Sequence, residues 1–318
     1  APVPFLDLFA LVPKPGAGTA VVGLAENGSP VLIKISPEET PHLLIIGGEG
    51  AGKTELLRTL ALSLSLSNRQ SQLQMVIIDP QLDDDQKKEK SPLSHLNYLP
   101  HLVMERASSS AEIEEQLEFL VDEMAYRLEQ QTETPPIMVF VDRLVPLLEQ
   151  DEGRNGESLM QLAQLSAEAG LHLIVSVNKP NSPKLNRLFL NNFSLRLVGR
   201  TKDEAESVAA AGISDSQAHY LLGKGDFLAI SEKQLTHFQA AFVNDTDLHM
   251  CLERMIRAVR RRLGAKPAAL RHQMPPIRAT NGEVKPAISL SAYPVDSSTG
   301  LSASEGESPV VRSRYDFV

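Results

Sequence analysis

A glycine-rich segment between residues 47 and 54 carries residue types that bind phosphate. It matches the pattern G-x-x-x-x-G-K-[ST] at every fixed position and reads Gly47-Gly48-Glu49-Gly50-Ala51-Gly52-Lys53-Thr54. Glycines let the backbone curl so that successive N–H groups point inward at phosphate oxygens, and a following helix adds its positive N-terminal end. Lys53 would reach the β- and γ-phosphates, and the Thr54 hydroxyl would ligate Mg²⁺. The segment therefore predicts a site for ATP and Mg²⁺, and the alternative is a glycine-rich turn that binds no ligand.

A second element of such a site is an apolar strand that ends in an aspartate. The run Ile137-Met138-Val139-Phe140-Val141 ends at Asp142. An aspartate at this position holds Mg²⁺ through its water shell. Many strands end in Asp, so the pattern is informative only together with the glycine-rich segment. We expect Thr54 and Asp142 to be the two residues on the metal side.

Short apolar runs alternate with amphipathic stretches along most of the chain. Strands are expected at Thr19–Ala25, Pro30–Ile35, His42–Ile46, Leu73–Asp79, Ile137–Asp142, Leu171–Val177, Leu195–Gly199, Asp226–Ile230 and Leu235–Val243. Helices are expected near residues 53–67, 110–130, 156–169, 183–191, 203–211 and 245–263. Continuous apolar strands between helices indicate an α/β fold with a central, mainly parallel sheet that helices cover on both faces.

The chain divides by composition into three parts. Residues 1–40 form a β-rich lead-in, and residues 41–263 hold the glycine-rich segment and the alternating strands and helices. Residues 264–318 are rich in Pro and Ser and show no sustained apolar period. Such a stretch buries too little apolar surface to offset its ordering entropy, so we expect a disordered tail.

Charge and cysteine content exclude several classes of protein. The 31 Lys and Arg against 40 Asp and Glu residues give a net charge of −9, which excludes a globally basic nucleic-acid coat but not a local basic patch. The single cysteine, Cys251, excludes an internal disulfide framework and a cysteine-rich zinc site. No apolar run approaches the ~20 residues that a membrane span needs. We expect a cytoplasmic location, with anchoring through an upstream segment left open.

Five fragments follow one another along residues 20–245. They are the entry Pro41–Gly47, the strand end Ile78-Asp79-Pro80, Pro100-His101-Leu102-Val103, the strand Gly170–Val175 with Asn178-Lys179-Pro180, and the turn Leu221–Phe227. Together they resemble the FtsK/SpoIIIE motor domain of the HerA–FtsK branch of P-loop ATPases. Each fragment alone is weak, but five in the family's order are specific. The resemblance implies a RecA-like P-loop NTPase fold and a ring, a homo-hexamer or a mixed ring, that threads double-stranded DNA at the expense of ATP. Related ATPases of type VII secretion systems use the same module on proteins.

The resemblance also implies roles for individual polar residues. Asn178 stands where family members use a glutamine to sense the γ-phosphate. Ring subunits of the family share each nucleotide site, with an arginine reaching in from the neighbour. Arg196 and Arg200 lie on or just after the strand that would face this junction, so both are candidates. The alternative is that they are surface arginines that cap a strand.

The chain departs from the family at the residue after Asp142. The family places a glutamate there to orient or deprotonate the attacking water, whereas this chain has Arg143. Arginine keeps its proton at physiological pH and cannot act as a base. Gln81 in place of lysine and the shorter Asn178 are further departures, and Lys179 in place of arginine is a milder one. We expect a site that binds ATP and Mg²⁺ but hydrolyses ATP slowly, unless another carboxylate such as Asp79 or Glu49 replaces the missing glutamate.

The sequence is compatible with three functions. The first is an ATP-dependent DNA translocase motor, and the second is an ATP-binding ring subunit with little or no turnover that organises or regulates its neighbours. The third is a secretion-type motor that acts on protein. The only basic run near the end of the last helix comprises Arg254, Arg257, Arg260, Arg261, Arg262 and Lys266. Because cations at a helix C-terminus complement its dipole, this run is weak evidence for DNA binding.

Overall fold

The computed structural model describes residues 2–80, 91–131, 134–149, 154–185, 187–232 and 234–263. The predicted tail at residues 264–318, Lys266 within it, and Gln81 lie outside these residues. The described residues build one sheet of ten strands, in the order β3-β2-β10-β9-β8-β4-β7-β6-β5, with β1 paired to β10. The strands are β1 Val3–Pro4, β2 Thr19–Ala25, β3 Pro30–Lys34, β4 Leu43–Ile46, β5 Gln74–Ile78, β6 Ile137–Val141, β7 Leu171–Val177, β8 Leu195–Gly199, β9 Asp226–Ile230 and β10 Leu235–Phe242.

The half of the sheet that carries the glycine-rich segment is parallel. Strands β8, β4, β7, β6 and β5 run in one direction, with β4 between β7 and β8. The other half, β9, β10, β2 and β3, is antiparallel. Strands β2 and β3 thereby join the same sheet as the rest of the chain through β10, although they lie in the segment 1–40 that composition sets apart.

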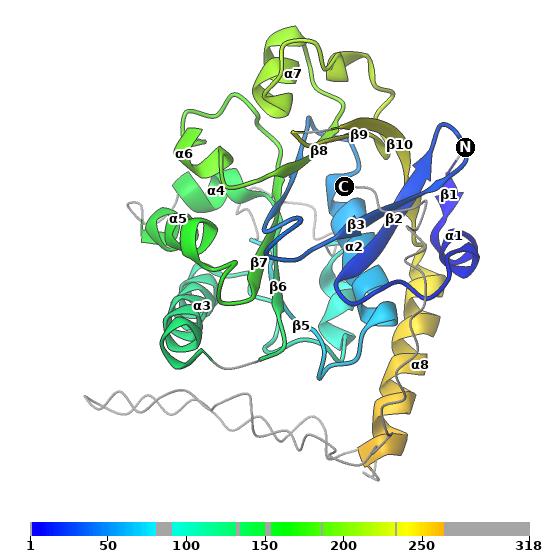
Figure 1. Ribbon diagram of the computed structural model, residues 1–318, viewed down its shortest axis with the longest axis vertical. Coiled ribbons are helices and arrows are strands. Elements are labelled where there is room, and N and C mark those ends of the chain that lie inside the picture. Colours follow the sequence, from blue (N-terminus) through cyan, green and yellow to red (C-terminus); the bar gives the residue numbers. More distant parts are fainter. Residues whose placement is uncertain are drawn as a thin grey trace, which may run out of the picture.

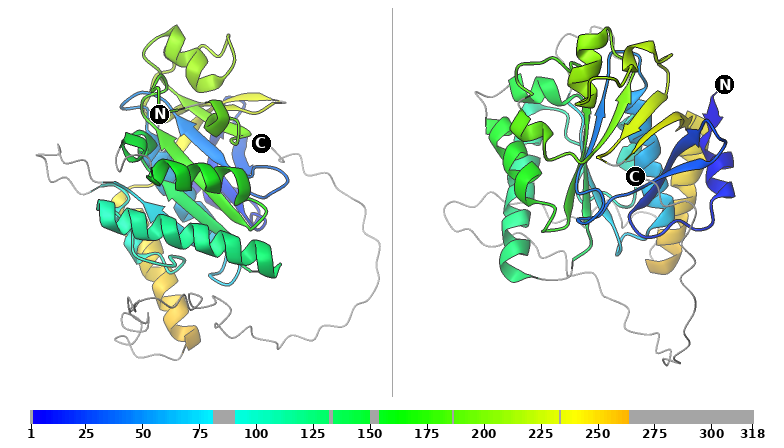
Figure 2. Two further views of the ribbon diagram at one scale, coloured as in Figure 1. Left: turned by 90° about the vertical axis from the view of Figure 1, so that its left-hand side faces the viewer. Right: turned by 45° about the horizontal axis from the view of Figure 1, so that its top comes forward.

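Helices cover both faces of the sheet (Figure 1). On one face, α1 and α2 contact β2 and β10, and α8 packs there as well (Figure 2). On the other face, residues of α3, α4, α5 and α7 share one apolar cluster. The helices are α1 Phe5–Leu11, α2 Lys53–Ser67, α3 Ser110–Gln130, α4 Leu144–Glu149, α5 Arg154–Leu165, α6 Arg187–Leu190, α7 Glu204–Ala211 and α8 Asp245–Leu263, with 3₁₀ turns at Ser94–Tyr98 and Ala218–Tyr220.

Burial on both faces explains why every residue of strand β4 is apolar. All four of its residues are fully buried. Leu43 and Ile45 belong to the cluster under α2, whereas Leu44 and Ile46 belong to the cluster under α3 and α5. A strand covered on both faces has no solvent side that would select polar residues. This confirms the predicted α/β fold with a parallel sheet at its centre.

Most of the predicted strands and helices are present with the same or nearly the same bounds. The helix expected at 156–169 begins at Arg154 and ends at Leu165. The helix expected at 183–191 is limited to Arg187–Leu190. Helices α1 and α4 were not predicted, because each has seven residues or fewer, too few to show a helical period. Among the described residues, no helix is both long enough and apolar enough to cross a bilayer.

Candidate functional site

The glycine-rich segment links the end of β4 to the start of α2, at the carboxyl edge of the parallel strands. The N–H of Gly47 donates to Val177 O at 3.1 Å, and the N–H of Gly48 donates to Arg200 O at 2.7 Å. The loop is thus fixed between the ends of β7 and β8. Gly52 precedes α2 with φ of +99°, and a Cβ there would lie 2.8 Å from the backbone N of Gly225. Only glycine fits this position, and ligands of open α/β sheets bind at this edge.

Lys53 is buried at the base of the loop. Its Nζ donates to Gly47 O at 2.9 Å and to Gly48 O at 2.7 Å, and 8% of the residue is exposed. Burial lowers the pKa of Lys53 to about 8, although the charges of Asp142 and Glu49 act in the opposite direction. A phosphate would offer charged acceptors, which bind an ammonium group more strongly than neutral carbonyls.

Thr54 and Asp142, which are far apart in the sequence, meet beside the loop. Thr54 Oγ1 donates to Asp142 Oδ2 at 2.9 Å, and the Ser176 hydroxyl donates to Asp142 Oδ1. Asp142 is 2% exposed, and burial raises its pKa, against the lowering effect of these two hydrogen bonds. Mg²⁺ prefers oxygen ligands, and a hydroxyl and a carboxylate stand here next to each other. The residues therefore fit ATP with Mg²⁺.

Arg143 occupies the position after Asp142 with its guanidinium directed at acidic groups. Its Nη2 lies 3.5 Å from Asp79 Oδ1 and donates to Pro80 O at 3.1 Å, and its Nε lies 4.0 Å from Asp142 Oδ2. Asp79 is 1% exposed and also accepts from Arg106 Nη1 at 2.8 Å. The carboxylate of Asp79 is therefore held by two arginines.

The other predicted residues lie in different surroundings. Glu49 is exposed, and Asn178 is partly buried, with its Oδ1 atom lacking a hydrogen bond to the described residues. Arg196 donates to Leu190 O at 3.3 Å and to Ala210 O at 3.4 Å, and burial lowers its pKa. These bonds favour the alternative in which Arg196 supports its own subunit. The side chain of Arg200 is exposed, and its Cδ lies 3.6 Å from the point where a Cβ on Gly223 would stand.

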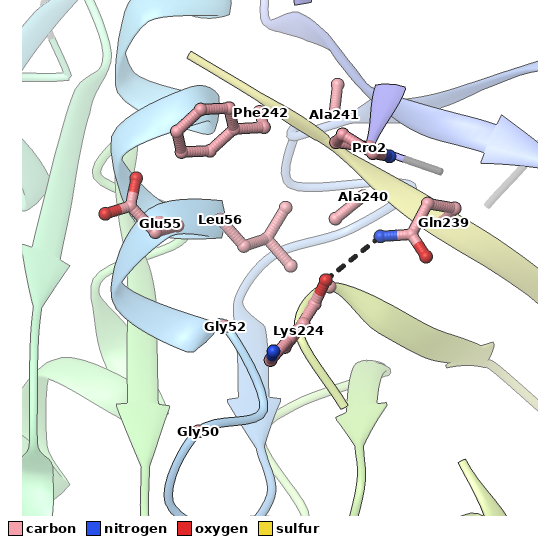
Figure 3. A pocket seen from close by; sticks show the side chains of 11 residues that line it. Pro2, Gly50, Gly52, Glu55, Leu56, Lys224, Gln239, Ala240, Ala241 and Phe242 are labelled. Atoms are coloured by element: carbon pink, nitrogen blue, oxygen red, sulfur yellow. Dashed lines mark hydrogen bonds between the residues drawn. The ribbon is translucent and has the colours of Figure 1, made fainter. Parts of the chain in front are cut away.

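A pocket of about 410 Å³ adjoins the glycine-rich loop on the side of β10. Gly50, Gly52 and Leu56 line it from the loop and α2, and Gln239 and Phe242 line it from β10 (Figure 3). The turn 223–225 connects the pocket to the loop, because Lys224 N donates to Gly50 O at 3.0 Å and Gly225 N donates to Ala51 O at 2.8 Å.

Sequence reasoning missed Ser176, Arg106 and the pocket. Strand β7 contains two polar residues, His172 and Ser176, and nothing in the sequence marks Ser176 of the two as a partner of Asp142. Arg106 belongs to no sequence motif, and it lies next to Asp79 only in the folded chain. Within the described residues, no cluster of three or more His, Cys, Asp or Glu side chains could hold a metal ion.

Comparison with known proteins shows similarity to one family in sequence and to P-loop ATPases in fold. Residues 14–130 match the model of the FtsK/SpoIIIE family. The DNA translocase FtsK of Staphylococcus epidermidis is 27% identical over 256 residues, which cover 71% of this chain and 30% of that protein. The DNA translocase SftA of Bacillus subtilis is 27% identical over 253 residues, which cover 72% of this chain and 25% of that protein. The chain thus spans less than a third of the length of these two relatives.

Solved structures with a similar fold include ATPases of two kinds. The cytoplasmic domain of the Thermomonospora curvata type VII secretion ATPase EccC superposes with a TM-score of 0.65 at 20% identity, covering 80% of this chain and 34% of that chain. The pCW3 conjugation coupling protein TcpA, in a monomer form with ATPgS, superposes with a TM-score of 0.62 at 22% identity. The superposition covers 79% of this chain and 76% of that chain. At this identity the likeness shows the fold alone, and it confirms the predicted RecA-like P-loop architecture.

Proposed function

Because the chain contains an FtsK/SpoIIIE-type motor domain, we propose that it binds ATP and Mg²⁺ at Gly47–Thr54 and Asp142 and belongs to an ATP-dependent translocase. The observation that carries this proposal is the contact between Thr54 Oγ1 and Asp142 Oδ2 beside the buried Lys53. A glycine-rich turn that binds no ligand does not require a buried lysine, a hydroxyl and a buried carboxylate to lie close together. Desolvating charged groups is costly unless a partner offsets the cost.

Each group has a distinct role in holding the nucleotide. The loop N–H groups and the N-terminus of α2 face the phosphates, and the Lys53 ammonium leaves its two carbonyl acceptors for phosphate oxygens. The Thr54 hydroxyl and the Asp142 carboxylate would hold Mg²⁺, which would supply positive charge that offsets the charge of the phosphates.

We propose that ATP hydrolysis is slow, because Arg143 follows Asp142 at the position where a general base would stand. Arg143 is a permanent cation, and it does not accept a proton from water. Asp79 is a poor replacement, since its carboxylate oxygens are already engaged by Arg106 and Arg143. Glu49 is exposed, and no hydrogen bond to the described residues holds it in place. Losing a positioned base costs on the order of 10²–10⁴-fold in rate.

DNA is the polymer that we favour for translocation, in a cytoplasmic, oligomeric ring. The support is that the relatives with matching sequence are named DNA translocases. Protein translocation is the alternative, supported by the secretion ATPases of similar fold. Arg143 favours a second candidate function, in which the chain is an ATP-binding ring subunit that assembles with or regulates catalytically active neighbours.

Removal of the loop lysine tests the proposal. Lys53→Ala is expected to lower ATP affinity by on the order of 10²-fold, because a buried ammonium–phosphate contact is lost. Binding is measured by calorimetry with ATP and excess Mg²⁺. The exposed Lys14→Ala is the matched control and is expected to bind as the wild type does. Equal affinity for both variants would contradict the assignment of the site.

A further inference from the structure

The exposed side of α3 carries a row of acidic residues. The helix has seven acidic residues and one basic residue, Arg127, which is buried and donates to Glu123 Oε1 at 2.7 Å. Three exposed acids recur at i, i+3 and i+7 and so lie along one side of the helix: Glu115, Glu118 and Asp122. None of the three has a hydrogen bond or an ion pair with another of the described residues. We call this row the acidic face of α3.

Helix α8 carries the opposite charge at the same spacing. Arg254, Arg257 and Arg261 also recur at i, i+3 and i+7, and all three are exposed. Among the described residues, only Arg257 of the three has an ionic partner, Glu253 in the same helix. Met250, which is 52% exposed, lies one turn before Arg254 on the same side. We call the three arginines the basic face of α8.

Each of these faces is unfavourable for its own helix. Like charges three or four residues apart on a helix repel each other and destabilise it. Glu118 stands in this relation to both of its neighbours in the acidic face, and Arg257 does so in the basic face. A surface of opposite charge laid on either face would remove the repulsion, so each face favours a partner that carries the charge of the other.

The two faces cannot meet within one subunit. Helix α3 packs on one face of the sheet through Ile113 and Leu117, whereas α8 packs on the other face through Leu248 and Leu252. Figures 1 and 2 show the two helices on opposite sides of the molecule. The acidic face of α3 is therefore within reach of an α8 helix only when that helix belongs to a second copy of the chain.

We propose that the basic face of α8 docks on the acidic face of α3 in a second copy of this chain. Because the spacings are equal, helices aligned in the same direction match residue for residue, as Arg254 with Glu115, Arg257 with Glu118 and Arg261 with Asp122. In this alignment Met250 lies level with the small, exposed Ala111.

Such a contact is head to tail, because it joins different surfaces of the two copies. Each copy then binds one neighbour through α8 and another through α3. The net charge of −9 makes copies repel one another in general, so the meeting of unlike faces also selects this orientation over others. The inference rests on the oligomeric part of the proposed function, and it uses no residue of the nucleotide site.

Charge reversal of one face at a time tests the contact. The α8-reversed variant combines Arg254→Glu with Arg261→Glu, and the α3-reversed variant combines Glu115→Arg with Asp122→Arg. Each variant places like charges opposite each other, so each is expected to weaken self-association roughly tenfold or more. Sedimentation velocity at low ionic strength measures the association. Wild-type association is expected to weaken with added salt, because the screening length falls to ~3 Å at 1 M.

Mixing the two variants provides the decisive comparison. In an equimolar mixture every α8 helix can find an α3 helix of opposite charge on the other variant, so association is expected to recover to within a few-fold of the wild type. Mixing does not repair a misfolded protein, so recovery also shows that both variants are folded. The control combines Glu168→Arg with Glu232→Arg, which reverses two exposed acids outside both helices, and is expected to associate as the wild type does.

Reversed variants that associate as the wild type does, or a mixture that shows no recovery, would overturn this inference and leave the proposed ring intact. A wild type that stays monomeric at every concentration would overturn both. If the α8-reversed variant associates normally but loses affinity for mixed-sequence DNA or for phosphatidylserine vesicles, the basic face binds a polyanion and the inference is wrong. ATP binding, measured on the same preparations, tests the nucleotide site independently of these outcomes.

Discussion

Arg143 has an unusual backbone conformation for its residue type. Its φ is +54°, in the left-handed region that non-glycine residues rarely adopt. Its N–H donates to Ser176 Oγ at 2.9 Å, and the same hydroxyl binds Asp142. The side chain is fixed at the other end by Asp79 and Pro80 O. A cation is therefore held beside the metal-side carboxylate by contacts at both ends of the residue.

Replacing this cation with a carboxylate tests whether the missing base limits turnover. Arg143→Glu is expected to raise the rate of ATP hydrolysis at least tenfold over Arg143→Ala, because a positioned base contributes on the order of 10²–10⁴-fold. Arg106 remains as a partner for Asp79 in both variants. Phosphate release at saturating ATP is the measurement. A glutamate variant no faster than the alanine variant would show that another group limits the reaction.

The pKa of Lys53 predicts a pH dependence of nucleotide binding. In the free protein, burial lowers this pKa to about 8, whereas bound phosphate favours the charged amine and raises it. Binding then takes up a proton above pH about 8, so ATP affinity falls as pH rises through this value. Lys53→Ala, measured over the same range, is expected to lack this dependence. A wild-type affinity that stays level up to pH about 10 would contradict the expectation.

At the scale of elements, apolar period and turn residues were enough to predict most strands and helices. The bounds of β2, β7, β8 and β9 were predicted to the residue, because apolar runs end there at polar or turn-forming residues. The short helices α1 and α4 follow from tertiary packing rather than period: Phe5 and Leu8 are buried under β2 and β10. The pairing of β10 with β2, over more than 200 residues of sequence, had no local signal.

That pairing is reinforced by His237 on β10. Its Nδ1 lies 2.6 Å from Glu26 Oε1, at the end of β2, and its Nε2 lies 2.6 Å from Asp226 Oδ1 on β9. Burial lowers the pKa of His237, but the hydrogen bonds and charges of Asp226 and Glu26 outweigh it and leave the pKa raised. The charged imidazole thus stabilises the fold at low pH.

Removing the imidazole is expected to destabilise the fold in a pH-dependent way. A raised pKa in the folded state means that the stabilisation is complete below the unfolded pKa of about 6.5 and is lost as pH rises through the folded pKa. The loss of unfolding free energy in His237→Gln is therefore larger at pH about 5.5 than at pH about 9. Urea unfolding measures it, with the exposed His249→Gln as control. A loss that grows with pH would contradict the role of the two carboxylates.

At the scale of the whole molecule, the residues of the candidate site come from segments that are distant in the sequence, and one sheet brings them together. The motif residues Lys53, Thr54 and Asp142 could be predicted from the sequence, because motif and strand end have a fixed geometric relation in this fold. Ser176, Arg106 and the wall of the pocket could not, since tertiary contacts alone place them. The replacement of the family's glutamate by Arg143 could be seen in the sequence, but the ion pair of Arg143 with Asp79 could not.

The proposed ring and the polymer that it would move also belong to this scale. Arg196 is bonded to Leu190 O and Ala210 O within its own subunit, which leaves the exposed Arg200 as the better candidate for a contact with a neighbour. Both roles stay predictions. A net charge of −9 means that any DNA contact depends on local cations, and its affinity should fall steeply with salt.

The most direct test measures ATP bound and phosphate released on one preparation of the purified protein, with and without DNA. We expect saturable ATP binding that requires Mg²⁺ and Lys53, together with hydrolysis that is on the order of 10²-fold or more slower than that of the Arg143→Glu variant. Absence of saturable binding, or identical binding by wild type and Lys53→Ala, would contradict the account. So would rapid wild-type turnover that Arg143→Glu does not increase.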